Sequence, residues 1–237
     1  MSELSRRKFL QQTGRGLAAT GVAGWMLRAD AMPTPTSPDA SEAEKILIEM
    51  GPPPAAVVSA RGDLTVTKTN PLGPFYRSGA PFRAKVCPPF EPGNVLIVSG
   101  RVWGFDTKRP LSGVVLDVWQ VDINGNYSAG NGDFKNRARL LTAEDGHYEF
   151  ETIHPVAYQP NPSMWRSAHI HFIAQVPNYK RLVSEMFFHG DPRQEADPMF
   201  HASLAVPVER REVNGKMVEF AVFDIVLEAE NGVKKSG

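Results

Sequence analysis

The sequence predicts an all-β protein, an antiparallel sandwich of two β-sheets with long loops and one or two short helices. Three observations support this fold class. The 237-residue chain contains 20 glycines and 20 prolines, more than a helical bundle tolerates. Short segments rich in β-branched and aromatic residues alternate with turn dipeptides. Hydrophobic residues make up 42% of the chain, enough for one sizeable core.

Six segments are expected to form strands, because β-branched and aromatic side chains suit a pleated, half-buried surface. In chain order they are 95–103, 114–121, 148–153, 168–174, 182–188 and 220–227. The turn dipeptides are Asn124-Gly125, Asn131-Gly132, Asp145-Gly146 and Asn214-Gly215. Many short strands separated by such turns indicate a sandwich or a barrel.

Residues 1–31 have the pattern of a twin-arginine export signal. The pair Arg6-Arg7 precedes a mildly apolar run at 17–27, and Ala29-Asp30-Ala31 resembles a cleavage site. The run is much shorter than the roughly 20 residues that cross a bilayer. We therefore expect a periplasmic or secreted protein with no stable membrane span once the signal is removed, although an uncleaved signal could tether it.

The region 32–70 is expected to be a proline-rich linker with one short helix at 42–50. Ser41 and Glu44 form a capping box for this helix, and Gly51 supplies its stop. Residues 71–237 then form a single β-domain.

Charge and cysteine content exclude several classes of function. The 26 basic residues balance 26 acidic ones, whereas a nucleic-acid-binding protein needs a basic excess to meet phosphates. The single cysteine permits neither an internal disulfide nor a thiolate metal cluster. A small molecule is the expected partner.

The candidate chemistry lies in histidines and tyrosines. His169 and His171 flank Ile170, and alternate residues of a strand point to the same face, so the two imidazoles make half of a metal site. Phenolate oxygen suits a hard cation such as Fe(III). Spacing alone does not choose among the five tyrosines, which are Tyr76, Tyr127, Tyr148, Tyr158 and Tyr179.

Between Pro71 and Leu227 the chain resembles the intradiol ring-cleavage dioxygenases, and it is most similar to their protocatechuate 3,4-dioxygenase branch. The runs that carry the resemblance are Gly73-Pro-Phe-Tyr76, Gly100-Arg-Val102, Asp117-Val-Trp-Gln120, Gly125-Asn-Tyr-Ser128, Asp145-Gly-His-Tyr-Glu-Phe150, Thr152-Ile-His-Pro155, Trp165-Arg-Ser-Ala-His-Ile-His-Phe172 and Phe188-His-Gly-Asp-Pro192. Together these runs are far more specific than a single His-x-His.

The resemblance implies a mononuclear non-haem Fe(III) held by Tyr127, Tyr158, His169 and His171. It also implies that Arg166 stabilises negative charge on the substrate ring, and that Tyr158 leaves the metal to accept a substrate proton. The expected substrates are a catechol-type aromatic diol and O2, and the product is a cis,cis-muconate-type diacid. The ring substituents are left open, as is assembly into a homo-oligomer.

One position departs from the family. Glu185 stands where these enzymes usually have glutamine near the substrate. An acid there either repels a substrate carboxylate or faces solvent.

Two other functions remain open at this stage. An exported β-sandwich can be a non-catalytic binding module, and a cupin-like Fe(II) or Mn(II) dioxygenase also uses His-x-His. The cupin-like site needs a carboxylate and a third histidine as ligands. Convergence of Tyr127, Tyr158, His169 and His171 in one pocket would separate the intradiol site from both.

Overall fold

The computed structural model describes residues 64–230, apart from 129, 131 and 132. The predicted export signal at 1–31 and the helix at 42–50 lie outside the described residues, as does the linker up to residue 63. Within the described residues the only helices are two 3-10 turns, η1 (Gln194–Ala196) and η2 (Ala202–Leu204). None of the described helices has the length and apolarity needed to cross a bilayer.

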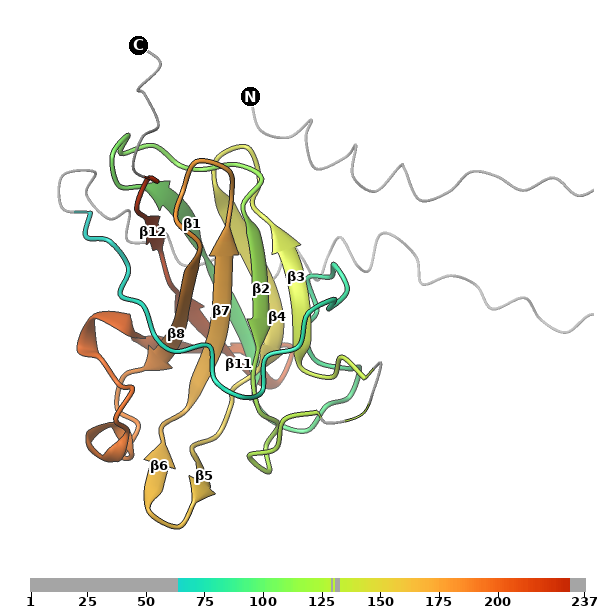
Figure 1. Cartoon of the computed structure of the whole chain (residues 1–237). Helices are drawn as coiled ribbons and strands as arrows, with labels where there is room; N and C mark the ends of the chain where they lie inside the picture. The colour runs from blue at the N-terminus through green and yellow to red at the C-terminus, as the bar shows by residue number, and fades with distance from the viewer. Residues whose placement is uncertain (1–63, 129, 131–132, 231–237) are drawn as a thin grey trace, which may run out of the picture. The chain divides into compact units, whose positions relative to one another are not determined.

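The described strands form two five-stranded sheets that pack face to face, and a separate hairpin (Figure 1). The first sheet contains β10 (Val208–Val213), β11 (Lys216–Val222), β1 (Val95–Gly104), β12 (Ile225–Leu227) and β4 (His147–Ile153). The second contains β3 (Arg137–Leu141), β2 (Val115–Trp119), β7 (His169–Gln175), β8 (Leu182–Phe188) and β9 (Ala205–Val206). The hairpin consists of β5 (Tyr158–Asn161) and β6 (Met164–Arg166). The predicted sandwich is confirmed.

The sheets are mixed, so the predicted antiparallel pairing holds for most but not all neighbouring strands. Strand β1 pairs in parallel with β11 and β12, and β8 pairs in parallel with β9. Only a short hairpin loop obliges neighbouring strands to run antiparallel. The strands of these three pairs are separated by longer stretches of chain. Local turn chemistry therefore does not specify whether they run parallel or antiparallel.

The predicted strand at 220–227 is divided in two. The chain leaves β11 at Phe223, whose amide donates to the Ser99 carbonyl at 2.9 Å. The Asp224 carboxylate then accepts hydrogen bonds from the Arg101 amide at 2.8 Å and from the Trp103 indole at 3.2 Å. Between the end of β11 and the start of β12, the Asp224 carboxylate therefore accepts a hydrogen bond from the β1 backbone that a backbone carbonyl would otherwise accept.

Gly100 makes this break in the strand possible. A Cβ at this position would overlap the backbone carbonyl of Phe223. We expect Gly100→Ala to lower the free energy of unfolding by about 3 kcal/mol, because the packed sheets cannot move apart to admit it. Urea denaturation measures this, with Ser99→Ala as the control in the same strand. Equal midpoints for the two variants would contradict the packing argument.

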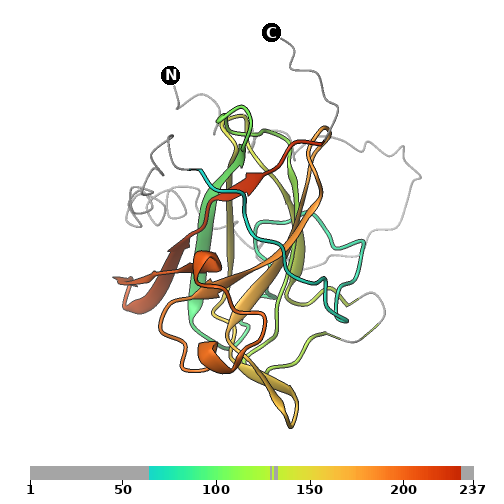
Figure 2. The ribbon, with the colours of Figure 1, turned by 60° about the vertical axis from the view of Figure 1, so that its left-hand side comes forward.

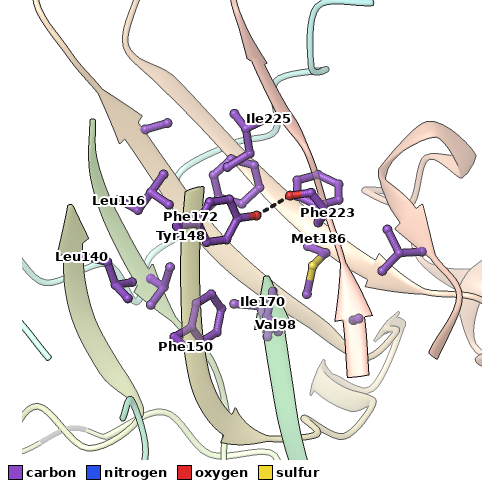
Figure 3. Packing of buried hydrophobic residues seen from close by; sticks show 14 of the residues in the cluster. Val98, Leu116, Leu140, Tyr148, Phe150, Ile170, Phe172, Met186, Phe223 and Ile225 are labelled. Carbon is purple, nitrogen blue, oxygen red and sulfur yellow. Dashed lines mark hydrogen bonds between the residues drawn. The ribbon is translucent and has the colours of Figure 1, made fainter. Parts of the chain in front are cut away.

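The core lies between the sheets and contains the inward-facing residues of both (Figure 3). Ile170 and Phe172 of β7 pack there against Phe150 and Phe223 from the opposite sheet (Figure 3). The hydroxyl of buried Tyr148 donates to the Phe223 carbonyl at 2.5 Å. Since neighbouring residues on a strand point to opposite faces, His169 and His171 must leave β7 on its outer face.

The segment 64–80 covers this outer face. It crosses the β8–β7–β2 side of the sheet in both views of the fold (Figures 1 and 2). The Asn70 amide donates to the Val183 carbonyl at 2.9 Å, and the Ser184 hydroxyl donates to the Lys68 carbonyl at 2.6 Å. These hydrogen bonds hold the segment 64–80 against the outer face of the sheet.

Candidate metal centre

Four donor atoms converge on the outer face of β7. The Tyr127 hydroxyl lies 2.9 Å from Nε2 of His171 and 3.4 Å from Nε2 of His169. The two Nε2 atoms are 3.1 Å apart, and the Tyr158 hydroxyl lies 3.3 Å from that of Tyr127. The structure thus brings together all four residues that the family resemblance implied as metal ligands.

A tight turn places the two tyrosines side by side. The Asp122 carboxylate accepts hydrogen bonds from the amides of Asn124 and Asn126, and so closes the turn just before Tyr127. Gly125 has a positive φ of 75°. A Cβ at this glycine would lie 2.8 Å from the Cβ of Tyr158. The predicted Asn124-Gly125 turn therefore brings the Tyr127 loop close to the start of β5.

Both imidazoles point Nε2 toward the Tyr127 hydroxyl. Nδ1 of His169 donates to the Ser167 carbonyl at 2.6 Å, and Nδ1 of His171 lies 3.2 Å from Oε1 of Glu185. Burial lowers the pKa of His169 to about 3 and that of His171 well below its usual value, so both rings are neutral. The two Nε2 atoms lie 3.1 Å apart, close enough for one cation to contact both.

The phenols complete a donor set that fits iron(III). Burial raises the pKa of Tyr127 well above 10, and the neighbouring Tyr158 adds to the effect. Burial also raises the pKa of Tyr158. A bound cation reverses this preference and favours phenolate. Two phenolate oxygens and two neutral imidazoles suit a hard transition-metal cation and leave coordination positions for a substrate.

Glu185 is buried, so the interpretation that it faces solvent is wrong. Its side chain is 1% exposed. Oε2 accepts hydrogen bonds from the Arg166 guanidinium at 2.6 Å and from the Asn70 amide at 2.9 Å. Oε1 faces Nδ1 of His171, which is the ring nitrogen opposite to the one that points at Tyr127. The carboxylate therefore lies on the Nδ1 side of His171, although His169, His171 and Glu185 each place one potential ligand atom within 4.8 Å of the others.

Arg166 is held by two carboxylates. Its Nε donates to Asp197 at 3.0 Å and its Nη2 donates to Glu185. Burial lowers the pKa of Arg166, but the two carboxylates more than offset this, so the pKa is raised. Asp197 also accepts hydrogen bonds from the amide and the hydroxyl of Ser167, whose carbonyl orients His169. Sequence reasoning missed Asn70 and Asp197, since neither belongs to a motif.

Comparison with known proteins identifies the family. The family model described as "Dioxygenase" matches residues 72–229. The chain belongs to the intradiol ring-cleavage dioxygenases. A chlorocatechol 1,2-dioxygenase of Rhodococcus opacus is 31% identical, over 66% of this chain and 70% of the relative. The protocatechuate 3,4-dioxygenase beta chain of Burkholderia cepacia is 33% identical over 122 residues, 47% of this chain and 52% of the relative.

A solved structure extends the comparison. The dioxygenase domain of a carbohydrate-binding fusion protein from Streptomyces sp. SirexAA-E is 32% identical, with a TM-score of 0.61. The match covers 70% of this chain and 100% of that domain. The chain spans about half of the length of several other curated relatives, including a 6-chlorohydroxyquinol 1,2-dioxygenase of Cupriavidus pinatubonensis. The predicted family and sandwich fold are therefore confirmed.

In this family member a cavity of about 430 Å³ opens beside the tyrosine donors. Tyr127 and Tyr158 line it, and Phe75 stacks on the Tyr127 ring at a centroid distance of 4.4 Å. Two guanidinium groups, from Arg77 and Arg137, also line the cavity, whereas its lining residues include no carboxylate. The cavity can admit a small aromatic molecule and is electropositive.

Proposed function

We propose that the protein is an iron(III)-dependent dioxygenase that cleaves a catechol-type diol with O2 between its two hydroxylated carbons, giving a cis,cis-muconate-type diacid. The observation that carries the proposal is the convergence of Tyr127, Tyr158, His169 and His171 with all four donor atoms facing inward. Iron(III) bound there would supply Lewis-acid activation of the diol toward O2.

Two residues have further roles in this proposal. The hydroxyl of Tyr158 lies at the cavity, where as phenolate it can accept a proton from a diol hydroxyl. Nε and Nη2 of Arg166 donate to Asp197 and Glu185, and in this proposal the positive charge of the guanidinium stabilises negative charge that develops on the ring. Arg166 is fixed before the substrate arrives, so its stabilising effect requires no rearrangement.

The alternative functions explain less of the geometry. A non-catalytic binding module has no need for four metal donors within 3.4 Å of their neighbours. A cupin-like site requires a carboxylate on the metal, but Glu185 faces the wrong nitrogen of His171. Among the described residues no third histidine joins the cluster that contains His169 and His171.

The cavity also favours one class of ring substituent. Arg77 and Arg137 contribute positive charge, and the lining residues other than the two tyrosine ligands contribute no negative charge. A diol with a carboxylate, such as 3,4-dihydroxybenzoate, should therefore bind more tightly than a diol with an ammonium group, such as dopamine. This argument rests on the same metal centre as the proposed reaction.

A visible absorption spectrum tests the proposal. The iron(III)-loaded protein should be red-brown from tyrosinate-to-metal charge transfer, and catechol should shift the band to longer wavelength. Titration with 3,4-dihydroxybenzoate, catechol and dopamine should give dissociation constants that increase in that order. The zinc-loaded protein is the colourless control. An iron-loaded protein without such a band would contradict the proposal, and equal constants would contradict the charge argument alone.

A further inference from the structure

Arg166 and His169 stand at the two ends of a very short connection. Arg166 is the last residue of β6 and His169 is the first residue of β7, so only Ser167 and Ala168 separate them. The amides of these two residues donate hydrogen bonds to carboxylate side chains. The directions in which the guanidinium and the imidazole point therefore depend on what holds this connection in place.

Both carboxylates belong to the loop 189–204, which follows β8 and lies beside the hairpin of β5 and β6 in both views (Figures 1 and 2). Asp191 accepts the Ala168 amide at 2.7 Å through Oδ2, and the Arg193 amide at 2.7 Å through Oδ1. Asp197 is the residue directly after η1. The loop thus reaches the connection at two points, about half a turn of chain apart from each metal donor it affects.

Asp191 acts on the peptide group that orients His169. The Ser167 carbonyl and the Ala168 amide belong to one planar peptide unit and point in opposite directions. Asp191 holds the N–H of this unit at 2.7 Å, and its carbonyl accepts a hydrogen bond from Nδ1 of His169 at 2.6 Å. The carbonyl therefore cannot rotate away from the imidazole unless the hydrogen bond to Asp191 breaks.

Asp197 acts on Arg166, and its side chain is 0% exposed. Oδ1 accepts hydrogen bonds from Nε of Arg166 at 3.0 Å and from the Met199 amide at 2.9 Å. Oδ2 accepts the amide and the hydroxyl of Ser167 at 2.8 and 2.9 Å. A carboxylate offers acceptors at both ends, whereas an asparagine would turn its NH2 toward one of these pairs. A buried donor would then have no acceptor.

We propose that Asp191 and Asp197 are positioning residues with divided roles, in which Asp191 sets the orientation of His169 and Asp197 sets that of Arg166. Each acts through its hydrogen bonds to the connection or to the guanidinium. The inference rests on the proposed function for the role of the metal and of Arg166 in the reaction. The two orientations themselves are properties of the metal-free protein.

The role of Asp191 is tested by comparing Asp191→Asn with Asp224→Asn. Asp224 is a matched control because its carboxylate also accepts a backbone amide, that of Arg101 at 2.8 Å, but on the other sheet. Iron(III) affinity of Asp191→Asn, measured by competition with a chelator, should fall about 10-fold, the lower end of the usual effect of losing an outer partner of a metal-bound histidine. Asp224→Asn should keep wild-type affinity. Equal affinities in the two variants would overturn the role of Asp191.

The role of Asp197 is tested by comparing Asp197→Asn with Glu219→Gln. Glu219 is the matched control because it is 1% exposed and accepts Nε of an arginine, Arg210, also at 3.0 Å. In Asp197→Asn, kcat per bound iron should fall about 10- to 100-fold. The KM for catechol should change little, because the displaced guanidinium acts on charge that develops after binding. Glu219→Gln should change neither constant. Wild-type kcat per bound iron in Asp197→Asn would overturn its role, even if the melting temperature fell.

A third measurement needs neither iron nor a variant. In the metal-free wild-type protein the amides of Ser167 and Ala168 should exchange with solvent as slowly as strand amides, and nitrogen-15 NMR should show His169 protonated at Nδ1. Rapid exchange of both amides would overturn the proposal. An iron-loaded protein without a charge-transfer band, but with both amides protected and His169 protonated at Nδ1, would instead overturn only the proposed function.

Discussion

The Tyr127→Phe variant is expected to lose tight iron binding and, with it, ring cleavage. Tyr127 is the donor that contacts the other three, with its hydroxyl 2.9 to 3.4 Å from their donor atoms. We expect iron(III) affinity and kcat/KM to fall by more than about 100-fold. Loss of a residue that only hydrogen-bonds to a metal ligand already lowers metal affinity or activity about 10- to 100-fold, and Tyr127 is proposed as a ligand itself. Chelator competition and an assay of muconate-type product measure the two quantities.

The fold should tolerate this change. Phenylalanine fills the same volume against Phe75, and the removed hydroxyl is buried. The free energy of unfolding of the metal-free variant should therefore stay within about 1 kcal/mol of wild type. Tyr179→Phe is the control, since its hydroxyl bonds to Asp106 away from the four donors. Undiminished iron affinity in Tyr127→Phe would remove Tyr127 from the proposed ligand set.

Arg166→Met is expected to reduce both turnover and stability. Without the guanidinium, Glu185 and Asp197 are left as buried carboxylates with no cation between them. Removing one partner from a buried ion pair costs about 3–5 kcal/mol. Loss of a group that stabilises transition-state charge lowers kcat about 100- to 1000-fold. Thermal unfolding of the metal-free protein and turnover per bound iron are the measurements.

A double variant separates these two effects. Arg166→Met combined with Asp197→Asn removes one of the two unpaired charges, so part of the lost stability should return. Turnover should stay low, since no cation faces the ring. If turnover recovered along with stability, Arg166 would be a structural residue only, and its proposed role in the reaction would be wrong.

Local sequence patterns predicted most of the sandwich. The segments 95–103, 148–153 and 182–188 agree with β1, β4 and β8 to within one residue at each end. The Asn214-Gly215 turn is confirmed, since both residues have positive φ and join β10 to β11. The segment 220–227 was predicted less well, because the carboxylate of Asp224 replaces ladder hydrogen bonds that a propensity argument counts as backbone pairs. Strands β3, β5, β6, β9 and β10 were not predicted.

The domain boundaries at 31 and 70 stay predictions, and residues 1–63 lie outside the described structure. Export through the Arg6-Arg7 signal and a periplasmic or secreted location are likewise predictions from the sequence. Assembly into a homo-oligomer likewise stays a prediction.

The sequence by itself determined that His169 and His171 leave one face of a strand, because side chains alternate along β7 with a period of two. Family resemblance added Tyr127 and Tyr158, which no spacing rule selects. Only the tertiary structure decided what surrounds them. The tyrosine donors lie 31 to 44 residues from their partners, and Asn70 lies 115 residues from Glu185. Contacts at such separations come from the pairing of β7 with β8 and from the covering segment 64–80, and neither leaves a local pattern in the chain.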